Sequence, residues 1–467
     1  MPEEPSERGP VFDRLMAYKV EFWQIGLFVL MLLLGVVGFG HLVLHQATGE
    51  RNYGMLGDAA IAVASLPRNT KQVFKTLIGG DSADLAVSEN RFEGEAGFVF
   101  SYDANTRPSS GYLLLSRYDG DAHRSIVEFI DLNQQRRLHT WAPDFAEINR
   151  HSKLKSALTD LDRDNSPERA RMMHPYATSD GGLVFENMSP LVKIDVCSNI
   201  VWMSERLYHH SVESDGENGF WAMAFREPQN LRGVSDHFKE DALMHVNSDG
   251  RIIFEKSLAQ ILLDNNLERL VFGLDFYSDD PLHLNDIQPI NANGRYWRRG
   301  DLLLSARNIS TIFIYRPSTN KIVWFKQGPW TNQHDVDVIG PSTIATFDNN
   351  RMNRRGRSYV AGVNNVIVYD LAGHSVSRPF QEGFKTHDIR TISEGRSEIV
   401  SDDDVIVEES NYGRLLRFDR DGEVEWSFVN RASDGKVYLV SWSRYLSPRQ
   451  GAALAKTVGD SKCATAD

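Results

Sequence analysis

Cysteine is nearly absent from this sequence, which has two cysteines, Cys197 and Cys463, in 467 residues. Neither belongs to a Cys-x-x-Cys pair or to a Cys/His spacing typical of zinc ligands, so the sequence predicts no structural zinc site. Cys463 lies in the polar segment 451–467, which we expect to be a flexible C-terminal tail. A disulfide between the two cysteines stays open, because nothing in the sequence supports it.

An excess of positive charge is also lacking. The chain has 51 Lys and Arg against 63 Asp and Glu, which gives a formal net charge of −12. Nucleic-acid binding needs a concentrated positive surface, so this balance predicts no nucleic-acid partner. An anionic small substrate is still compatible with it, because one local cluster of Arg or His side chains can bind such a molecule.

Charged side chains are missing from residues 22–44, FWQIGLFVLMLLLGVVGFGHLVL. About 20 consecutive apolar residues span a bilayer as a helix, so we predict a transmembrane helix over residues 22–45. A cleaved signal peptide is the alternative. Its apolar region would be shorter, and HQATGERNYG, which begins at the end of this run, offers a poor cleavage site.

Basic residues near the two ends of this helix predict its orientation. The N-terminal flank carries Arg8, Arg14 and Lys19, whereas Arg51 is the one basic residue that closely follows the helix. By the positive-inside rule, residues 1–21 form a cytoplasmic tail of a single-pass protein in a bacterial inner membrane, with the body in the periplasm. Residues 46–90 are predicted to form a short helical connector.

From residue 91 onward, short apolar runs alternate with Gly, Asn, Asp and Ser, as in strands and turns. One hairpin unit recurs six times, and its second apolar run ends in an aromatic residue. The aromatic ends are Trp141, Trp202, Phe254, Trp324, Phe380 and Trp426. Repeats of about 40–50 residues are the expected period of a propeller. We therefore predict an all-β, six-bladed β-propeller over residues 91–450, with seven blades as the alternative.

Five histidines recur in register with these hairpins: His174, His210, His283, His334 and His387. The first strand of each blade lines the central channel of a propeller, so equivalent positions on different blades converge near one end of the axis. We therefore expect a ring of imidazoles there. For any single histidine, the alternative is a contact with a neighbouring Asp that stabilises a turn within its blade.

Three motifs in the middle of the chain resemble the bacterial arylsulfate sulfotransferases. They are HLNDIQP at 283–289, GDLLLSARNISTIFIYRPSTNKIVWF at 300–325, and QHDVDV followed by ATFDNN within 333–350. The likeness extends over about residues 170–430. It implies a six-bladed propeller that transfers a sulfuryl group from an aryl sulfate to a phenolic or other hydroxyl acceptor, through a sulfated histidine and without a nucleotide cofactor.

The resemblance assigns roles motif by motif. The nucleophile falls on His334, and the other catalytic positions fall on His283, on Arg307 and on His210, with the adjacent His209 as an alternative to His210. A neutral imidazole is a competent nucleophile, and the fork of donors on an arginine suits a tetrahedral oxyanion. Further substrate contacts are expected from Asn285, Asn349, His174 and His387.

Two other functions compete with this reading. The first is a non-catalytic propeller that serves as a scaffold or subunit of an envelope assembly, with a membrane protein as partner. The second is a metal site in which the imidazoles bind Zn, Cu or Ni and Asp286, Asp335 and Asp388 orient them. Arg307 opposes a metal, because a fixed cation repels a metal ion. All four catalytic positions are filled, which favours the enzyme.

Overall fold

The computed structural model describes residues 21–48, most of 51–64, residues 85–461 except 88, 274–275 and 355–356, and residue 463. The chain divides into two units, residues 1–81 and 82–467. Residues 1–20 of the predicted tail, 1–21, and most of the predicted connector, 46–90, lie outside the described residues. The end of that connector belongs to the second unit instead, because Ala86 pairs with Tyr438 in an isolated β-bridge.

The first unit contains one long helix, α2 (Phe22–Thr48). Its residues Phe22–Gln46 are long and apolar enough to cross a membrane, and none of the apolar window is buried. A helix of this length and composition near an N-terminus serves either as a membrane anchor or as a signal sequence.

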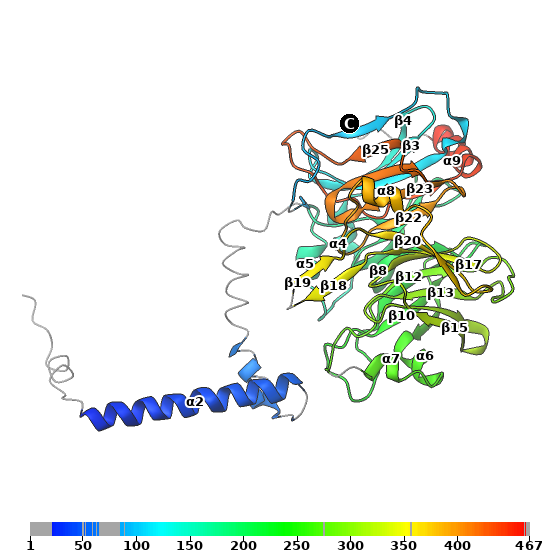
Figure 1. The fold of residues 1–467 in the computed structure, drawn as a ribbon. Helices are drawn as coiled ribbons and strands as arrows, with labels where there is room; N and C mark the ends of the chain where they lie inside the picture. The colour runs from blue at the N-terminus through cyan, green and yellow to red at the C-terminus, as the bar shows by residue number, and fades with distance from the viewer. Residues whose placement is uncertain are drawn as a thin grey trace, which may run out of the picture. The chain divides into compact units, whose positions relative to one another are not determined.

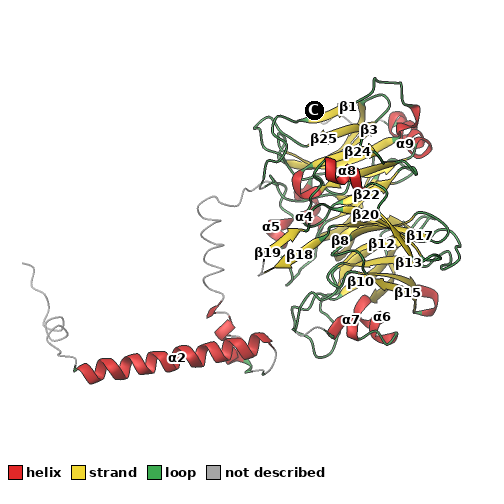
Figure 2. Ribbon diagram, in the orientation of Figure 1, coloured by secondary structure: helices red, strands yellow, loops and turns green. Residues whose placement is uncertain are grey.

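The second unit is an all-β, propeller-like body of antiparallel sheets (Figures 1 and 2). One sheet has the order β26 (Arg444–Leu446), β2 (Tyr112–Asp119), β3 (Arg124–Asp131) and β4 (Arg136–Trp141). A seven-stranded sheet contains β5 (Met173–Ala177), β6 (Leu183–Glu186), β7 (Ser189–Ile194), β8 (Ile200–Ser214), β9 (Phe220–Phe225), β10 (Asp241–Val246) and β11 (Ile252–Ser257).

The remaining strands continue in chain order. Two sheets of four contain β12 (Leu284–Pro289), β13 (Leu302–Ala306), β14 (Thr311–Arg316) and β15 (Lys321–Gln327), and then β16 (His334–Val338), β17 (Thr343–Asp348), β20 (Asn365–Asp370) and β21 (Ser375–Ser377). The last large sheet contains β22 (Arg396–Ile399), β23 (Asp404–Glu409), β24 (Arg414–Asp419), β25 (Val424–Val429) and β1 (Gly97–Phe100). A separate hairpin pairs β18 (Arg351–Arg354) with β19 (Arg357–Val360).

Short helices connect these sheets. They are α4 (Phe145–His151), α5 (Leu161–Asp164), α6 (Leu258–Asp264), α7 (Arg269–Phe272) and α8 (Gln381–Thr386), with 3₁₀ turns at Pro108–Ser110, Pro317–Thr319 and Ser410–Tyr412. The six hairpins predicted from the repeat are all present, as the pairs β3–β4, β7–β8, β10–β11, β14–β15, β20–β21 and β24–β25. Phe380 is the exception among their aromatic ends, because β21 stops at Ser377.

The aromatic repeat supplies the core. Trp141 and Trp426, which end two of the hairpins, are completely buried between sheets. Removing such a large side chain from a packed interior costs about 3–5 kcal/mol, so these positions hold neighbouring sheets together.

The innermost strands are linked by side chains that accept a backbone N–H from the next sheet. The links run from Ile287 N to Ser211 Oγ (3.2 Å), from Val336 N to Asp286 Oδ2 (2.6 Å) and from Ser397 N to Asp335 Oδ2 (2.8 Å). Asp286 and Asp335 therefore connect neighbouring sheets and do not orient imidazoles.

The two ends of the body close it. The C-terminal strand β26 is the inner neighbour of β2, and the N-terminal strand β1 extends the sheet of β25. Closure thus pairs segments more than 300 residues apart, and every large sheet is antiparallel within itself.

Much of the predicted flexible tail, residues 451–467, is helical, which corrects that expectation for residues 451–460; residues 462 and 464–467 lie outside the described residues. Helix α9 (Pro448–Asp460) begins with a capping box at Ser447 and Gln450 and buries Leu454 and Val458 against the core. Its amphipathic spacing gives it an apolar face, which a reading of the polar composition alone does not reveal.

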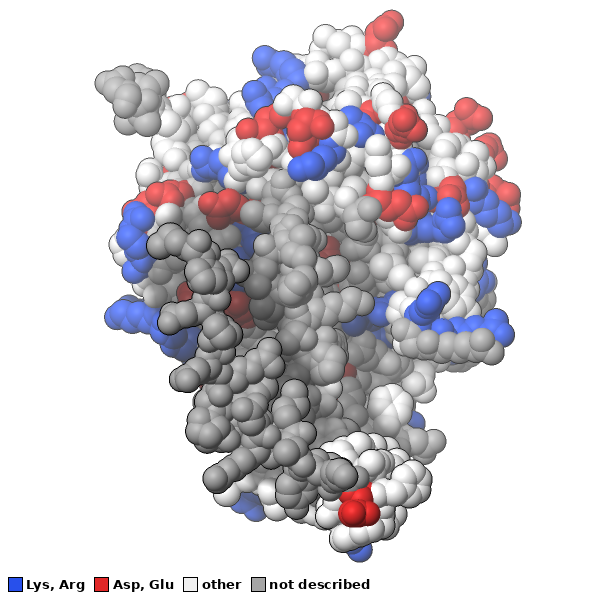
Figure 3. Space-filling model, turned by 90° about the vertical axis from the view of Figure 1, so that its left-hand side faces the viewer, with Lys and Arg blue, Asp and Glu red and all other residues white. Residues whose placement is uncertain are grey.

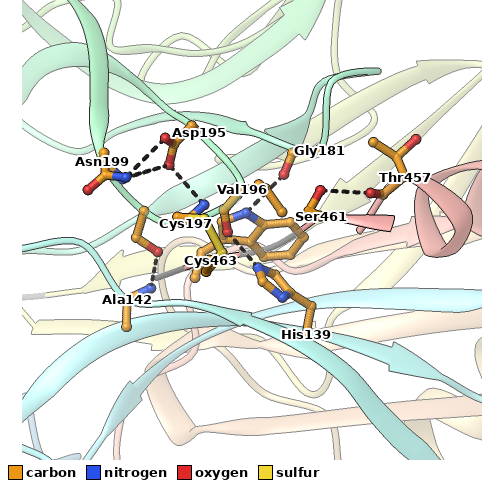
Figure 4. Close-up of a disulfide and its surroundings, with 12 residues drawn as sticks. His139, Ala142, Gly181, Asp195, Val196, Cys197, Asn199, Thr457, Ser461 and Cys463 are labelled. Atoms are coloured by element: carbon orange, nitrogen blue, oxygen red, sulfur yellow. Dashed lines mark hydrogen bonds between the residues drawn. A yellow bond between two sulfur atoms is a disulfide. The ribbon is translucent and has the colours of Figure 1, made fainter. Parts of the chain in front are cut away.

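A disulfide joins Cys197 to Cys463, which the sequence left open (Figure 4). Cys197 lies in the turn between β7 and β8, where Asp195 accepts its backbone N–H at 2.8 Å. His139 of β4 reaches the same turn and donates its Nε2 proton to the carbonyl of Val196, also at 2.8 Å. The C-terminus is therefore fixed covalently where two sheets meet.

The surface carries mixed charge. Figure 3 shows Lys and Arg interspersed with Asp and Glu over the upper part of one face. On this face the charges of the two signs are mixed rather than gathered into patches of one sign.

Candidate functional site

Three of the predicted histidines converge from different strands. The ring centroid of His210, in β8, lies 5.2 Å from that of His283 and 6.4 Å from that of His334. His283 immediately precedes β12, and His334 begins β16. His210 and His283 have φ angles of 68° and 53°, in the left-handed region that costs a non-glycine residue about 1–3 kcal/mol. Strain of this kind is retained where it directs side chains toward a site.

His334 is completely buried and held in one tautomer. Asn349 donates its amide Nδ2 to the carbonyls of Thr391 (3.2 Å) and Glu394 (2.9 Å), so its Oδ1 faces His334. That oxygen lies 2.5 Å from Nδ1 of His334 and must accept its proton. The lone pair is therefore on Nε2, which the backbone N–H of Glu394 approaches at 3.3 Å.

The environment keeps His334 neutral. Burial, followed by the positive charge of Arg307, holds the pKa of His334 well below its usual value. A buried, neutral imidazole whose lone pair lies on Nε2, where it accepts one long hydrogen bond from the backbone N–H of Glu394, is suited to nucleophilic attack or to metal binding.

Arg307 follows β13 and supplies a cation with unused donors. Its backbone N–H donates to the carbonyl of His283 at 3.0 Å, and its Nε donates to Oδ1 of Asn308 at 3.1 Å. Its two Nη groups have no partner among the described residues. Burial, followed by the nearby Arg351, lowers the pKa of Arg307 to about 10. A desolvated guanidinium with free N–H groups is a strong site for an oxyanion.

His283 is paired with a carboxylate. Its Nδ1 lies 2.7 Å from Oδ2 of Asp280, which leaves Nε2 toward the other imidazoles. Burial lowers the pKa of His283, although the bond to Asp280 opposes this. Against the effect of burial, the same bond lowers the pKa of Asp280 to about 2. The pair can therefore take up a proton on His283 when an anion arrives.

The structure distinguishes His210 from the adjacent His209. His209 stacks on Phe225 with centroids 4.2 Å apart, and its Nε2 lies 3.3 Å from Oδ1 of Asp241. Its Nδ1 faces Nδ1 of His210 at 2.8 Å, so one proton is shared between the two rings. Burial and then His209 hold the pKa of His210 well below its usual value. His210 is thus the member that meets His283 and His334.

Two other predicted ring members differ in position. The Nε2 of His174, in β5, accepts a hydrogen bond from Nη1 of Arg396 at 3.0 Å, and no ring contact joins His174 to the other three among the described residues. His387 does not join the ring, and that expectation is wrong. It follows α8, its Nε2 donates to the carbonyl of Gly422 at 2.7 Å, and the inner strand of its sheet starts only at Arg396.

The predicted asparagines are both buried beside His334. Asn349 fixes the His334 ring, as described above. Asn285 donates its Nδ2 to the carbonyl of Gln333 at 2.8 Å, next to His334 in the chain. Its Oδ1 is buried and has no hydrogen-bond partner among the described residues.

Asp388 was predicted to orient an imidazole. It instead lies at the surface beside Arg91 and Arg390.

Trp442 is part of the site but was not found from the sequence. Its ring centroid lies 5.6 Å from that of His174, 6.3 Å from His210 and 6.0 Å from His334. It is completely buried, its φ is 57°, and its indole N–H has no partner among the described residues. It lies two residues before β26, the last inner strand, where no histidine marks the repeat, so only ring closure reveals its position.

An ion pair next to His334 was also missed. Arg171 donates Nη1 and Nη2 to the two carboxylate oxygens of Glu394 at 3.0 and 2.8 Å, and its Nε donates to Oγ of Ser441. This pair fixes the backbone that approaches Nε2 of His334. The partners are 223 residues apart, so no local pattern predicts it.

A family model described as arylsulfotransferase (ASST) matches residues 188–431. No curated protein matches the sequence.

Several solved structures resemble the chain at low similarity. A protein of unknown function from Bacteroides caccae has 10% identity and a TM-score of 0.43 and covers 72% of this chain and 98% of its own. Virginiamycin B lyase from Staphylococcus aureus has 9% identity and a TM-score of 0.35 and covers 70% and 88%. Hydrazine synthase from Kuenenia stuttgartiensis has 12% identity and a TM-score of 0.37 and covers 70% and 81%.

Proposed function

Because the chain belongs to the arylsulfotransferase family, we propose that it transfers a sulfuryl group from an aryl sulfate to a phenolic or other hydroxyl acceptor. The observation that carries this proposal is the nearness of two groups: His334, whose lone pair lies on Nε2, and Arg307, whose Nη groups are unpartnered among the described residues and whose charge lowers the pKa of His334. A nucleophile and an oxyanion site are the two parts that sulfuryl transfer needs.

The first half-reaction forms a sulfohistidine. Nε2 of His334 attacks the sulfur, the N–S bond forms, and the S–O bond to the aryl group breaks. Arg307 stabilises the charge that spreads over the equatorial oxygens, as in phosphoryl transfer. The leaving phenolate takes a proton from His283, whose cationic form is supported by Asp280.

The second half-reaction reverses these roles. The acceptor hydroxyl gives its proton to the now neutral His283, and its oxygen attacks the sulfur. The N–S bond breaks, which restores His334 and leaves the sulfate ester of the acceptor. The proton returns to its starting position, so no cofactor or external base is consumed.

We also infer the blade count and the location. Strand β8 pairs with β7 through its first half and with β9 through its second half, with a register break at His209. Counting β8 in two blades divides the seven-stranded sheet and gives six blades over residues 91–450. The disulfide favours an oxidising compartment, which supports a body in the periplasm held by α2 as an inner-membrane anchor with its N-terminus inside.

The test is turnover of 4-nitrophenyl sulfate by the full chain in detergent, with phenol as acceptor. We expect nitrophenol release that depends on phenol and yields phenyl sulfate in equal amount. No turnover with a range of phenols by folded protein would overturn the enzyme and leave the non-catalytic scaffold as the better reading.

Replacing Asn349 with Leu removes the acceptor that fixes the His334 tautomer. We expect kcat to fall about 10- to 100-fold with little change in KM, as for other partners that orient an imidazole. Asn349→Asp keeps an oxygen at that position and should retain more activity, while raising the pKa of His334 and with it the pH at which activity falls. Equal activity in wild type and Asn349→Leu would contradict the assigned tautomer.

The dependence of kcat/KM on pH follows from the lowered pKa of His334. Since His334 reacts in its neutral form, we expect protonation of His334 to lower kcat/KM only below pH 6.5, the usual pKa of histidine. Arg307→Gln removes the positive charge that lowers this pKa, so the residual activity of that variant should decline at a higher pH. A decline at the same pH in both proteins would assign it to another group.

A further inference from the structure

The hairpin β18–β19 projects from the sheet of β16 and β17 directly beside the site. It begins two residues after Asn349, and its base is fixed by Asn350, whose Nδ2 donates to the carbonyls of Ala361 (2.6 Å) and Val363 (3.1 Å). Arg351 at this base lies close enough to lower the pKa of Arg307. The hairpin therefore begins beside the histidine cluster.

One face of the hairpin is exposed and carries a defined set of side chains. The register pairs Met352 with Tyr359 and Arg354 with Arg357. Because side chains alternate along a strand, these four residues share one face, whereas Arg351 lies on the opposite one. Met352 and Tyr359 are 38% and 43% exposed, and both arginines are exposed as well.

The charge of this face is not compensated locally. Residues 349–363 contain no Asp or Glu. Arg354 and Arg357 make no ion pair with the described residues, although they lie directly opposite each other. Like charges at such positions destabilise a strand pair, and a two-stranded hairpin is marginal by itself. An external anion would relieve this repulsion.

We propose that the face formed by Met352, Arg354, Arg357 and Tyr359 binds the anionic headgroups of a lipid bilayer. The face is an open strand surface, which suits an extended partner better than a small ligand enclosed in a pocket. Arginine pairs bidentately with phosphate, and tyrosine favours the level of the headgroups.

The same chain contains the apolar helix α2, which is long enough to cross a bilayer. Residues 49–84 reach at most about 120 Å when extended, so the connector permits the contact. If the proposed sulfuryl transfer holds, a site held beside the bilayer in this way takes its acceptor from the membrane surface. Lipid binding itself does not depend on that chemistry.

The two native cysteines form a disulfide, so Tyr359→Cys introduces the one free thiol. We would label it with bimane in the full chain, in nanodiscs of phosphatidylcholine alone or with added phosphatidylglycerol. We expect blue-shifted emission, protected from an aqueous quencher, only in anionic discs at low salt. Each arginine near the surface contributes about fivefold to partitioning, so adding Arg354→Gln and Arg357→Gln should lower the bound-to-free ratio about 25-fold.

Two matched controls separate this contact from general proximity to lipid. Val323→Cys, an exposed position on β15, should show no shift, and Arg299→Gln with Arg420→Gln removes two charges elsewhere without effect. Identical emission in both lipids and in detergent, which would point to a soluble acidic partner, overturns the proposal. A shift that survives the Arg354 and Arg357 substitutions overturns it too. Turnover of aryl sulfate is measured separately, so a failure of the lipid-binding proposal is distinguishable from a failure of the proposed sulfuryl transfer.

Discussion

Replacing His334 with Asn is expected to lower kcat for sulfuryl transfer from 4-nitrophenyl sulfate to phenol by on the order of 10⁴-fold, as for loss of an enzymatic nucleophile. Asparagine has a similar size but no basic nitrogen at the position of Nε2. KM should change little, because Arg307 continues to bind the sulfate. The His334→Asn variant should lose both the phenol-dependent release of nitrophenol and the formation of a sulfated protein.

The intermediate gives a second measurement. Wild-type protein mixed with donor alone should gain one sulfuryl group on the peptide that contains His334, and phenol should then remove it. His374→Asn is the matched control. His374 is exposed in the turn between the outer strands β20 and β21, and its φ of 51° is a conformation that asparagine tolerates. Undiminished transfer in His334→Asn would refute the sulfohistidine.

Removing the disulfide with Cys197→Ser and Cys463→Ser should lower the free energy of unfolding by up to about 5 kcal/mol. The cross-link spans 266 residues, and long loops lose the most conformational entropy when they are closed. It also holds α9 against the core where β26 completes the first sheet. Urea unfolding of wild type and double variant, with and without reductant, measures the difference.

Reductant provides the internal control for this experiment. It should destabilise the wild type to the level of the double variant and leave the double variant unchanged. If reductant shifted both proteins equally, or neither, the cross-link would not be a source of stability.

Much of the architecture follows from local pattern in the sequence. The six hairpins were predicted because apolar runs, turn residues and terminal aromatics recur, and each of these is a short-range signal. The convergence of His210, His283 and His334 follows from the same repeat once equivalent positions are placed on neighbouring inner strands. Their roles in chemistry remain predictions that the experiments above test.

The failures have two causes, a local departure from the pattern that was read and contacts between distant segments. His387 was misplaced because α8 delays the inner strand of its sheet, which shifts the repeat locally. Other features could be identified only from the closed ring, which brings distant segments together. They are Trp442, the ion pair Arg171–Glu394 and the Cys197–Cys463 disulfide. A polar composition hid the apolar face of α9, because composition ignores helical spacing.

The pairing of β26 with β2 has a consequence for the timing of synthesis. A chain that has emerged from the ribosome only as far as Asn430 already holds all three converging histidines and Arg307. It still lacks Trp442, the inner strand beside β2 and the cross-link to Cys197. Because polypeptides are made from the N-terminus, this part of the site is made after the converging histidines. If the proposed function holds, activity therefore has to wait until β26 and Cys463 have been made and the ring has closed.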